Sequence, residues 1–386
     1  MRGVVRERLE SARDELIDLS HRIHANPELG YEEEQASEWL SDYLDANGFA
    51  VTKGVCDIPT AFVARYGSGP LHIAICAEYD CLPAVGHACG HNIIAAMGVG
   101  AGIAAAKVAD EAGLTISVMG TPAEEGGGGK ILMLERGAFE GVHASMMVHP
   151  APLDVVELPI IAADHFDVYY TGKEAHASAS PEVGINAADA LTIAQTAIGL
   201  LRQHIKSTDR IHGIITKGGD AANIVPAHTS AHYMVRAKTL GELHDIRAKV
   251  NRCFEAGALA TGCELSMDWH EDTEYAPMKN NRTMVEAYRR NGEELGMHLI
   301  TLGELTTGSS DMGNVSQVVP SIHPNFSVGA PALTHSPEFT AAAITDAAHE
   351  GMLRAAKALA MTAIDVALEP GLLDRIKSDF KGRQGS

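Results

Sequence analysis

Cysteine is scarce in this sequence. Six cysteines are spread over 386 residues, and their spacing is not that of a disulfide scaffold. Basic residues are outnumbered as well, because 30 lysines and arginines face 50 acidic residues and leave a formal charge of −20. No basic stripe is present. The sequence therefore predicts reduced thiols and a chain that binds neither nucleic acid nor a membrane surface.

Long apolar segments are also missing. The first eight residues, MRGVVRER, lack the apolar core of a signal peptide, and no later run is long enough to span a bilayer. These absences predict a cytoplasmic protein. Its 386 residues, 46% of them hydrophobic, are enough for two or more globular domains with substantial cores.

Three short apolar runs have the composition of strands that are buried on both faces of a parallel sheet. They cover residues 71–77, 114–119 and 144–148. Each run leads directly into charged or metal-binding side chains. Because the ligand site of an open α/β sheet lies at the carboxyl ends of its strands, we expect these side chains to meet at one edge.

The residues after these strands predict a dinuclear metal site. Cys89 and His91 are two positions apart, so in an extended segment both face one ion, and thiolate and imidazole both suit zinc. The pair Glu124-Glu125 follows the second run and His149 the third. A Cys-x-His pair alone is more often a buried cysteine beside a surface histidine, and an acidic pair alone is usually solvated. The convergence of three strands favours the metal site.

The order of elements changes after about residue 165. The pattern there predicts a strand, a helix, two strands, a helix and a strand, at 166–171, 185–204, 211–216, 231–237, 240–260 and 263–269. This β-α-β-β-α-β succession is typical of a ferredoxin-like α+β domain. We therefore expect an α/β catalytic domain, with flanking helices on a mixed, mostly parallel sheet, and an inserted lid domain. The predicted divisions are 1–164, 165–275 and 276–386.

Other elements follow from periodicity and from residues that break helices. We expect helices at 4–25, 32–46, 90–109, 282–295 and 339–361, strands at 49–52 and 61–66, an extended segment at 318–322, and a loosely attached tail from 370. The run Gly126–Gly129 before Lys130 is not a phosphate loop, because no Ser or Thr follows the lysine. Its glycines are expected to let the backbone pass close to the metals.

Taken together, the motifs C-G-H, E-E, His149-Pro150 and Thr334-His335 resemble those of the di-zinc aminoacylase/carboxypeptidase metallopeptidases, which are metallopeptidase family twenty of clan MH. More narrowly, the loop Gly308–Val315 is similar to the amidohydrolase branch with aminobenzoyl-glutamate hydrolase and β-alanyl dipeptidase-like proteins. The resemblance covers nearly the whole chain. It implies two divalent metal ions, zinc or manganese, and a candidate bridging role for the cysteine. The implied ligands are Cys89, His91, Glu125, His149 and His335.

The resemblance also implies roles next to the metals. Glu124 takes the position of the general base, and Asp80 would orient a ligand from behind. Glu78 stands where the branch often has Asp, which leaves its role open.

Three residues of the insert match positions with a role in the family. His176 resembles the histidine that reaches the oxyanion in the site of a partner subunit, which implies a homodimer through the lid domain. Asn223 and Arg236 resemble residues that hold a substrate carboxylate. Both also have a structural interpretation, since Asn before a turn and Arg at a strand end are common without function.

The expected function is that of a metal-dependent amidohydrolase or peptidase acting on a small-molecule amide. Candidate substrates are an N-acyl amino acid, an aminobenzoyl-glutamate-like compound or a small dipeptide, attacked by a metal-activated water. One alternative is an inactive binding or scaffold protein that retains the fold, although all five ligand positions are filled. Another is a hydrolase with Cys89 as nucleophile and His91 as its base, although a thiolate at this position is expected to bind metal.

Overall fold

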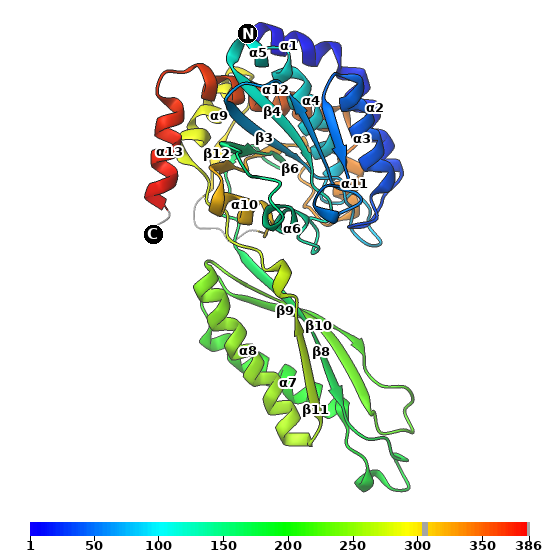
Figure 1. Ribbon diagram of the computed structural model, residues 1–386. Helices are drawn as coiled ribbons and strands as arrows, with labels where there is room; N and C mark the ends of the chain where they lie inside the picture. Colours follow the sequence, from blue (N-terminus) through cyan, green and yellow to red (C-terminus); the bar gives the residue numbers. More distant parts are fainter. Residues whose placement is uncertain (303–307, 384–386) are drawn as a thin grey trace. The chain divides into compact units, whose positions relative to one another are not determined.

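The computed structural model describes residues 1–302 and 308–383, and the chain forms two compact units (Figure 1). One unit combines Met1–Pro159 with Met278–Ser386, and the other is Ile160–Pro277. The divisions expected at 164/165 and 275/276 lie a few residues from these junctions. The insert extends further on both sides because β8 (Ala162–Thr171) begins early and Tyr275 still pairs with Ala163.

The first unit contains a six-stranded mixed sheet in the order β1-β2-β4-β3-β5-β13. At its centre, β3 (Leu71–Ala77) runs parallel to both β4 (Leu114–Gly120) and β5 (Ala144–Met146), and β5 is parallel to β13 (Ser321–Ile322). The remaining strands, β1 (Ala50–Lys53) and β2 (Phe62–Tyr66), pair antiparallel at one edge. Because β3, β4 and β5 are parallel, the residues that follow them emerge at the same edge of the sheet.

Helix α4 (His91–Ala106) is buried along its whole length. It packs on β3 and β4 and is covered by α2 (Arg13–Ala25) and α12 (Asp346–Leu368). Small residues allow the close approach, since a Cβ on Gly102 would lie 2.2 Å from Val118 Cγ2. No helix among the described residues has both the length and the apolar composition that a membrane span requires.

The remaining elements of this unit flank the central sheet. A second, four-stranded sheet has the order β12-β7-β14-β6. Its strands are β12 (Ile300–Thr301), β7 (Val155–Glu157), β14 (Asn325–Ser327) and β6 (His149–Ala151). The other helices are α1 (Arg2–Ser11), α3 (Glu34–Ala46), α5 (Ala109–Ala112), α6 (Gly129–Glu135), α9 (Arg282–Glu294), α10 (Met312–Val318), α11 (Pro337–Ala342) and α13 (Leu372–Arg383).

Two segments predicted as single helices are each divided. The segment 4–25 breaks at Ala12, which has φ −97° and ψ 0°. The segment 339–361 is divided between two helices, since α11 ends at Ala342 and α12 begins after Thr345. The side chain of Thr345 accepts a hydrogen bond from the amide of Ala348 and so caps α12.

Two predictions for the C-terminal part need correction. Val318 ends α10, so the extended segment predicted at 318–322 starts one residue later, at Val319 with φ −125° and ψ 132°, and forms the strand β13 at Ser321–Ile322. The tail forms α13, which packs on α9 and buries Leu372 and Ile376. Burial of these two apolar side chains attaches the tail to the fold.

The insert has its own core and its own sheet. Its elements are β8, α7 (Ala187–Leu201), β9 (Arg210–Lys217), β10 (His228–Ala237), α8 (Leu240–Thr261) and β11 (Glu264–Trp269). The sheet is antiparallel in the order β11-β8-β10-β9, and α7 and α8 cover one of its faces (Figure 1). Strands and helices follow each other in the split β-α-β order.

Candidate metal centre

The carboxyl ends of the parallel strands supply the side chains of the site. Glu78 and Asp80 follow β3, and Glu124-Glu125 follows β4. His91 is the first residue of α4. The structure explains why the residue before it is a glycine. Gly90 has φ 80°, and a Cβ at this position would lie 2.6 Å from Pro150 Cγ, so a larger residue would displace the Cys89–His91 turn.

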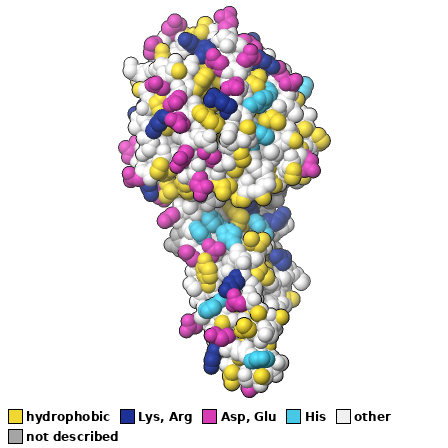
Figure 2. All heavy atoms as spheres, turned by 90° about the vertical axis from the view of Figure 1, so that its right-hand side faces the viewer, with side chains coloured by type: hydrophobic (Ala, Val, Ile, Leu, Met, Phe, Trp, Pro, Cys, Tyr) yellow, Lys and Arg dark blue, Asp and Glu magenta, His cyan; other side chains and the backbone are white. Residues whose placement is uncertain are grey.

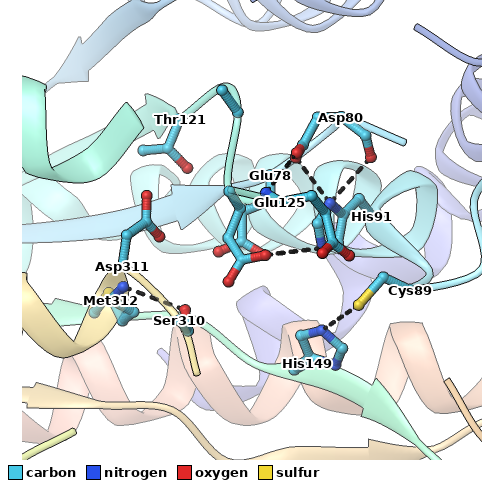
Figure 3. A network of polar contacts seen from close by, with 12 residues as sticks. Glu78, Asp80, Cys89, His91, Thr121, Glu125, His149, Ser310, Asp311 and Met312 are labelled. Atoms are coloured by element: carbon cyan, nitrogen blue, oxygen red, sulfur yellow. Dashed lines mark hydrogen bonds and ion pairs between the residues drawn. The ribbon is translucent and has the colours of Figure 1, made fainter. Parts of the chain in front are cut away.

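The structure brings the five predicted metal ligands together. Figure 3 shows four of them, Cys89, His91, Glu125 and His149. Cys89 groups with His91 and His149, and it also groups with Glu125 and His335; within each group the ligand atoms lie within 4.8 Å of one another. Cys89 Sγ is 3.3 Å from His149 Nε2, and His335 Nε2 is 3.4 Å from Glu125 Oε1. The cysteine is thus the member that the two groups share.

His91 has one ring nitrogen available for a metal. Its Nδ1 hydrogen-bonds to Asp80 Oδ1 at 2.8 Å, while its buried Nε2 has no hydrogen-bond partner within the described parts of the chain. This nitrogen lies 3.6 Å from Glu78 Oε2 and 3.9 Å from Glu124 Oε2. Asp80 also accepts a hydrogen bond from the amide of Glu125 at 2.9 Å, so one carboxylate orients two candidate ligands. An unpaired nitrogen and convergent carboxylates fit a divalent cation.

The electrostatics of the site also fit a cation. Burial raises the pKa of the Cys89 thiol well above its usual range, and Glu125 raises it further. Burial likewise raises the pKa of Glu124 well above its usual range, followed by the charges of Glu78 and Glu125. The Cys89 thiol and the Glu124 carboxyl are therefore hard to ionise in this buried acidic cluster. A bound cation would stabilise both groups as anions.

Two ligand-bearing turns contain residues in the left-handed region. His335 has φ 65°, and Ala123, just before Glu124, has φ 54°. The amide of His335 donates to the carbonyl of Ala88 at 2.8 Å, which ties this loop to the Cys89 turn. Strained backbone of this kind is found where a structure fixes functional side chains.

A buried lysine next to the site was missed in the sequence. Lys130 is completely buried, and its Nζ lies 2.5 Å from Glu78 Oε1 and 2.6 Å from Asp311 Oδ1. Glu78, whose role the motifs left open, forms an ion pair with Lys130. One glycine of the run before Lys130 has a packing role, because Gly129 lies against the backbone of Pro122, where a Cβ would be 1.9 Å from the carbonyl oxygen.

His323 is a second residue that sequence reasoning missed. It is buried, and its ring stacks on that of His149 with centroids 5.7 Å apart and planes 25° apart. Neither of its ring nitrogens has a hydrogen-bond partner in the described chain. It directly follows β13, so the rule that found His149 at the end of a strand applies to it as well.

The three predicted residues of the insert fall into two places. His176 pairs with Ile224, and the amide of Ala177 donates to the carbonyl of Asn223 at 3.0 Å. Arg236 lies near the opposite end of β10, beside His212, with Arg236 Nε donating to His212 Nε2 at 3.3 Å. Eight steps of about 3.3 Å along β10 separate His228, at its start, from Arg236 by about 26 Å. Within one insert, His176 and Asn223 are therefore adjacent, and Arg236 is remote from both.

The family assignment comes from comparison with known proteins. The sequence pattern of peptidase family M20/M25/M40 matches residues 75–359, a range that includes every predicted site residue. The chain belongs to this family. Among its relatives, the Xaa-Arg dipeptidase of Mus musculus is 43% identical over 392 residues, covering 97% of this chain and 91% of the relative. A subunit of the p-aminobenzoyl-glutamate hydrolase of Escherichia coli is 29% identical and covers 97% and 93%.

Solved structures of M20-like chains share the fold. A dinuclear metal-binding peptidase of the M20 family from Bacillus subtilis superposes with a TM-score of 0.69 at 20% identity, covering 92% of this chain and 99% of that one. An aminobenzoyl-glutamate utilization protein from Klebsiella pneumoniae gives 0.73 at 18% identity, covering 93% and 97%. The resemblance stated from the motifs is confirmed, and the protein is a metal-dependent amide or peptide hydrolase of the M20 family.

Proposed function

We propose that this M20 hydrolase cleaves the amide bond of a small dipeptide, an N-acyl amino acid or an aminobenzoyl-glutamate-like compound at a centre with two divalent ions, zinc or manganese. The observation that carries the proposal is the pair of ligand groups that share Cys89. Thiolate, imidazole and carboxylate are donors that suit zinc and related ions. The proposed ligands are Cys89, His91, Glu125, His149 and His335.

The side chains around the ligands have separate tasks. Bound divalent ions would lower the pKa of a water molecule and polarise the scissile carbonyl. Glu124 would accept the proton of that water and pass it to the leaving amine, since it sits beside the ligands while its neighbour Glu125 faces His335. Asp80 would keep His91 in the tautomer that presents Nε2 to the metal.

The substrate class is proposed from the relatives. The mouse relative is named for dipeptides that end in arginine, and the bacterial relative for aminobenzoyl-glutamate. The higher identity of the first, 43% against 29%, favours a dipeptide with a C-terminal arginine as the first substrate to test.

The insert is proposed to act as a lid that joins two subunits. Strand β9 is the last strand of its sheet and exposes Ile214 and Ile215, which are 65% and 50% accessible, so it offers an apolar edge for pairing. His176 would then donate to the oxyanion in the site of a second copy. Asn223 and Arg236 would hold the substrate carboxylate as contributions from different copies, since they are remote from each other within one insert. Light scattering in solution would test the dimer. The six cysteines, all free thiols, suit the reducing cytoplasm.

The decisive experiment pairs a substrate panel with a variant of Glu124. Metal-reconstituted enzyme should hydrolyse one class among Xaa-Arg dipeptides, β-alanyl dipeptides, N-acetyl amino acids and aminobenzoyl-glutamate. Glu124→Ala should abolish this activity and retain the bound metal. Glu135→Ala, which removes an exposed glutamate at the end of α6, should behave like the wild type. A fully active Glu124→Ala enzyme would reject the assignment.

The same preparation separates the metal mechanism from attack by the thiol of Cys89. A chelator should remove activity, and added divalent metal should restore it. Activity that survives the chelator and disappears on alkylation of Cys89 would instead support a cysteine nucleophile.

A further inference from the structure

A second group of metal-binding side chains lies in the insert. Asp167 is on β8, His232 is on β10, and His270 follows β11, and their ligand atoms lie within 4.8 Å of one another. Figure 2 shows histidine side chains gathered on one face of the insert. The group shares no residue with the M20 centre, and none of the motifs discussed above includes it.

The fold of the insert explains why these residues meet. Asp167 and His232 are direct cross-strand partners on the sheet face opposite α7 and α8. His270 reaches the same place because its amide donates to the carbonyl of His165 at 3.2 Å, which folds the chain back after β11. The ring of His165 stacks on that of His270 with centroids 4.5 Å apart, and this contact fixes the orientation of the His270 ring.

The two histidines approach different oxygens of one carboxylate. His232 Nδ1 lies 3.0 Å from Asp167 Oδ1, and His270 Nε2 lies 3.1 Å from Asp167 Oδ2. Burial alone would raise the pKa of Asp167, but the hydrogen bonds from His232 and His270 hold it below its usual range. The carboxylate is therefore ionised at neutral pH. Burial, followed by the charges of His270 and His232, lowers the pKa of His165 to about 4, so its ring adds no competing charge.

These spacings suit ligands of one ion. Two ligand atoms each about 2.1 Å from one metal ion are about 3.0 Å apart at a right angle and about 3.4 Å apart at the tetrahedral angle, so the observed separations are close to those of a shared ion. We propose that Asp167, His232 and His270 bind a divalent transition-metal ion, with zinc as the reference case, at a site of the insert that is separate from the M20 centre. Two imidazoles and one carboxylate favour zinc, cobalt or nickel over calcium and magnesium, which prefer oxygen ligands.

The ion would connect three elements of the insert. It would hold the segment after β11 on β8 and β10, shortly before the chain leaves the insert at Pro277. Because the metal binds the folded insert, it would stabilise this unit by mass action. The alternative is that Asp167 is shared by two histidines through hydrogen bonds alone.

Zinc stoichiometry of the full chain distinguishes these alternatives. After removal of all metal, equilibrium dialysis against Zn²⁺ should give one more bound equivalent in the wild type than in Asp167→Asn or His232→Gln. The matched control is His244→Gln, because His244 Nε2 contacts Glu274 Oε2 at 2.7 Å but belongs to no group of three ligands among the described residues. This control should bind as much zinc as the wild type. Unchanged stoichiometry in both site variants, with folding verified by circular dichroism, would overturn the proposal.

Cobalt spectra test the insert while the M20 centre lacks two of its five proposed ligands. In a Cys89→Ala, His149→Ala double variant, one equivalent of Co²⁺ should still bind and show visible ligand-field bands without thiolate charge transfer. Adding Asp167→Asn to this variant should remove these bands. If the double variant binds no Co²⁺, or if its bands persist after Asp167→Asn, the insert does not contain the proposed site.

Discussion

Lys130 Nζ lies 2.5 Å from Glu78 Oε1, and neither side chain is accessible to solvent. Asp311 Oδ1 is a second acceptor at 2.6 Å, and Asp311 Oδ2 accepts the amide of Lys130 at 2.8 Å. Burial alone would lower the pKa of Lys130, but Asp311 and Glu78 hold it well above its usual range, so the lysine stays charged. This cation joins the end of β3 to the loop before α10.

Lys130→Met should destabilise the protein strongly. The substitution removes one positive charge and leaves two buried carboxylates without their partner, which costs about 3–5 kcal/mol for a buried pair. Urea unfolding followed by circular dichroism measures the loss. The control is Lys53→Met, because Lys53 pairs with Asp42 at 2.9 Å with accessibilities of 49% and 65%, and an exposed pair contributes less than about 1 kcal/mol. Equal losses in the two variants would show that Lys130 does not stabilise the fold through its charge.

Asp80→Asn should weaken metal binding without unfolding the protein. The substitution exchanges one oxygen of the carboxylate that orients His91 and the amide of Glu125. Loss of such an orienting partner typically lowers metal affinity by about 10-fold to 100-fold. Competition with a chromogenic chelator measures the affinity, and Asp110→Asn, on the exposed side of α5, is the control. Wild-type affinity in Asp80→Asn would remove its positioning role.

The parts of the site that could be predicted from the sequence are the residues that directly follow the parallel strands. Parallel strands end at a common edge, so the residues after β3 and β4 could be placed together from the amino-acid sequence alone. The same rule applies to His323, because the extended segment predicted at 318–322 ends at Ile322, as β13 does. The error in that segment lies at its other end, where Val318 belongs to α10.

The ion pair between Lys130 and Asp311 could not be predicted from the neighbouring sequence. Lys130 and Asp311 are 181 residues apart, and nothing in the glycine run before Lys130 indicates that the lysine is buried against a distant carboxylate. The break before α12 was detectable in principle, because Thr345 is a favoured helix-capping residue. The alanine-rich sequence on both sides concealed it, since alanine has the highest helix propensity.

His176→Ala should lower kcat far more than it raises KM. The ring accepts hydrogen bonds at Nδ1 from the amides of Ser178 and Ala179, at 3.3 and 3.2 Å, which leaves the proton on Nε2 as a donor. A lost oxyanion donor costs about 10²-fold to 10³-fold in kcat. Steady-state kinetics of His176→Ala beside His228→Ala, an exposed histidine on β10, measures the effect. If kcat is unchanged, His176 takes no part in the reaction.

Protonation of the His72 ring should lower the stability of the protein in mild acid. Its Nε2 hydrogen-bonds to Ser117 Oγ at 2.7 Å, and burial, followed by the charge of Arg65, lowers its pKa to about 4. The unfolded chain has a histidine pKa of about 6.5, so it binds more protons than the folded chain between these values. The stability from His72 is therefore complete above about pH 6.5 and is lost as the pH falls toward about 4.

The substitution His72→Gln removes this titration and should flatten the pH dependence. Urea unfolding at about pH 7 and about pH 5 should show a larger loss of free energy of unfolding in the wild type than in the variant. His204→Gln, which removes an exposed histidine of the insert, is the control and should keep the wild-type difference. The explanation fails if wild type and His72→Gln lose the same stability, since burial of the neutral ring would then carry no proton linkage.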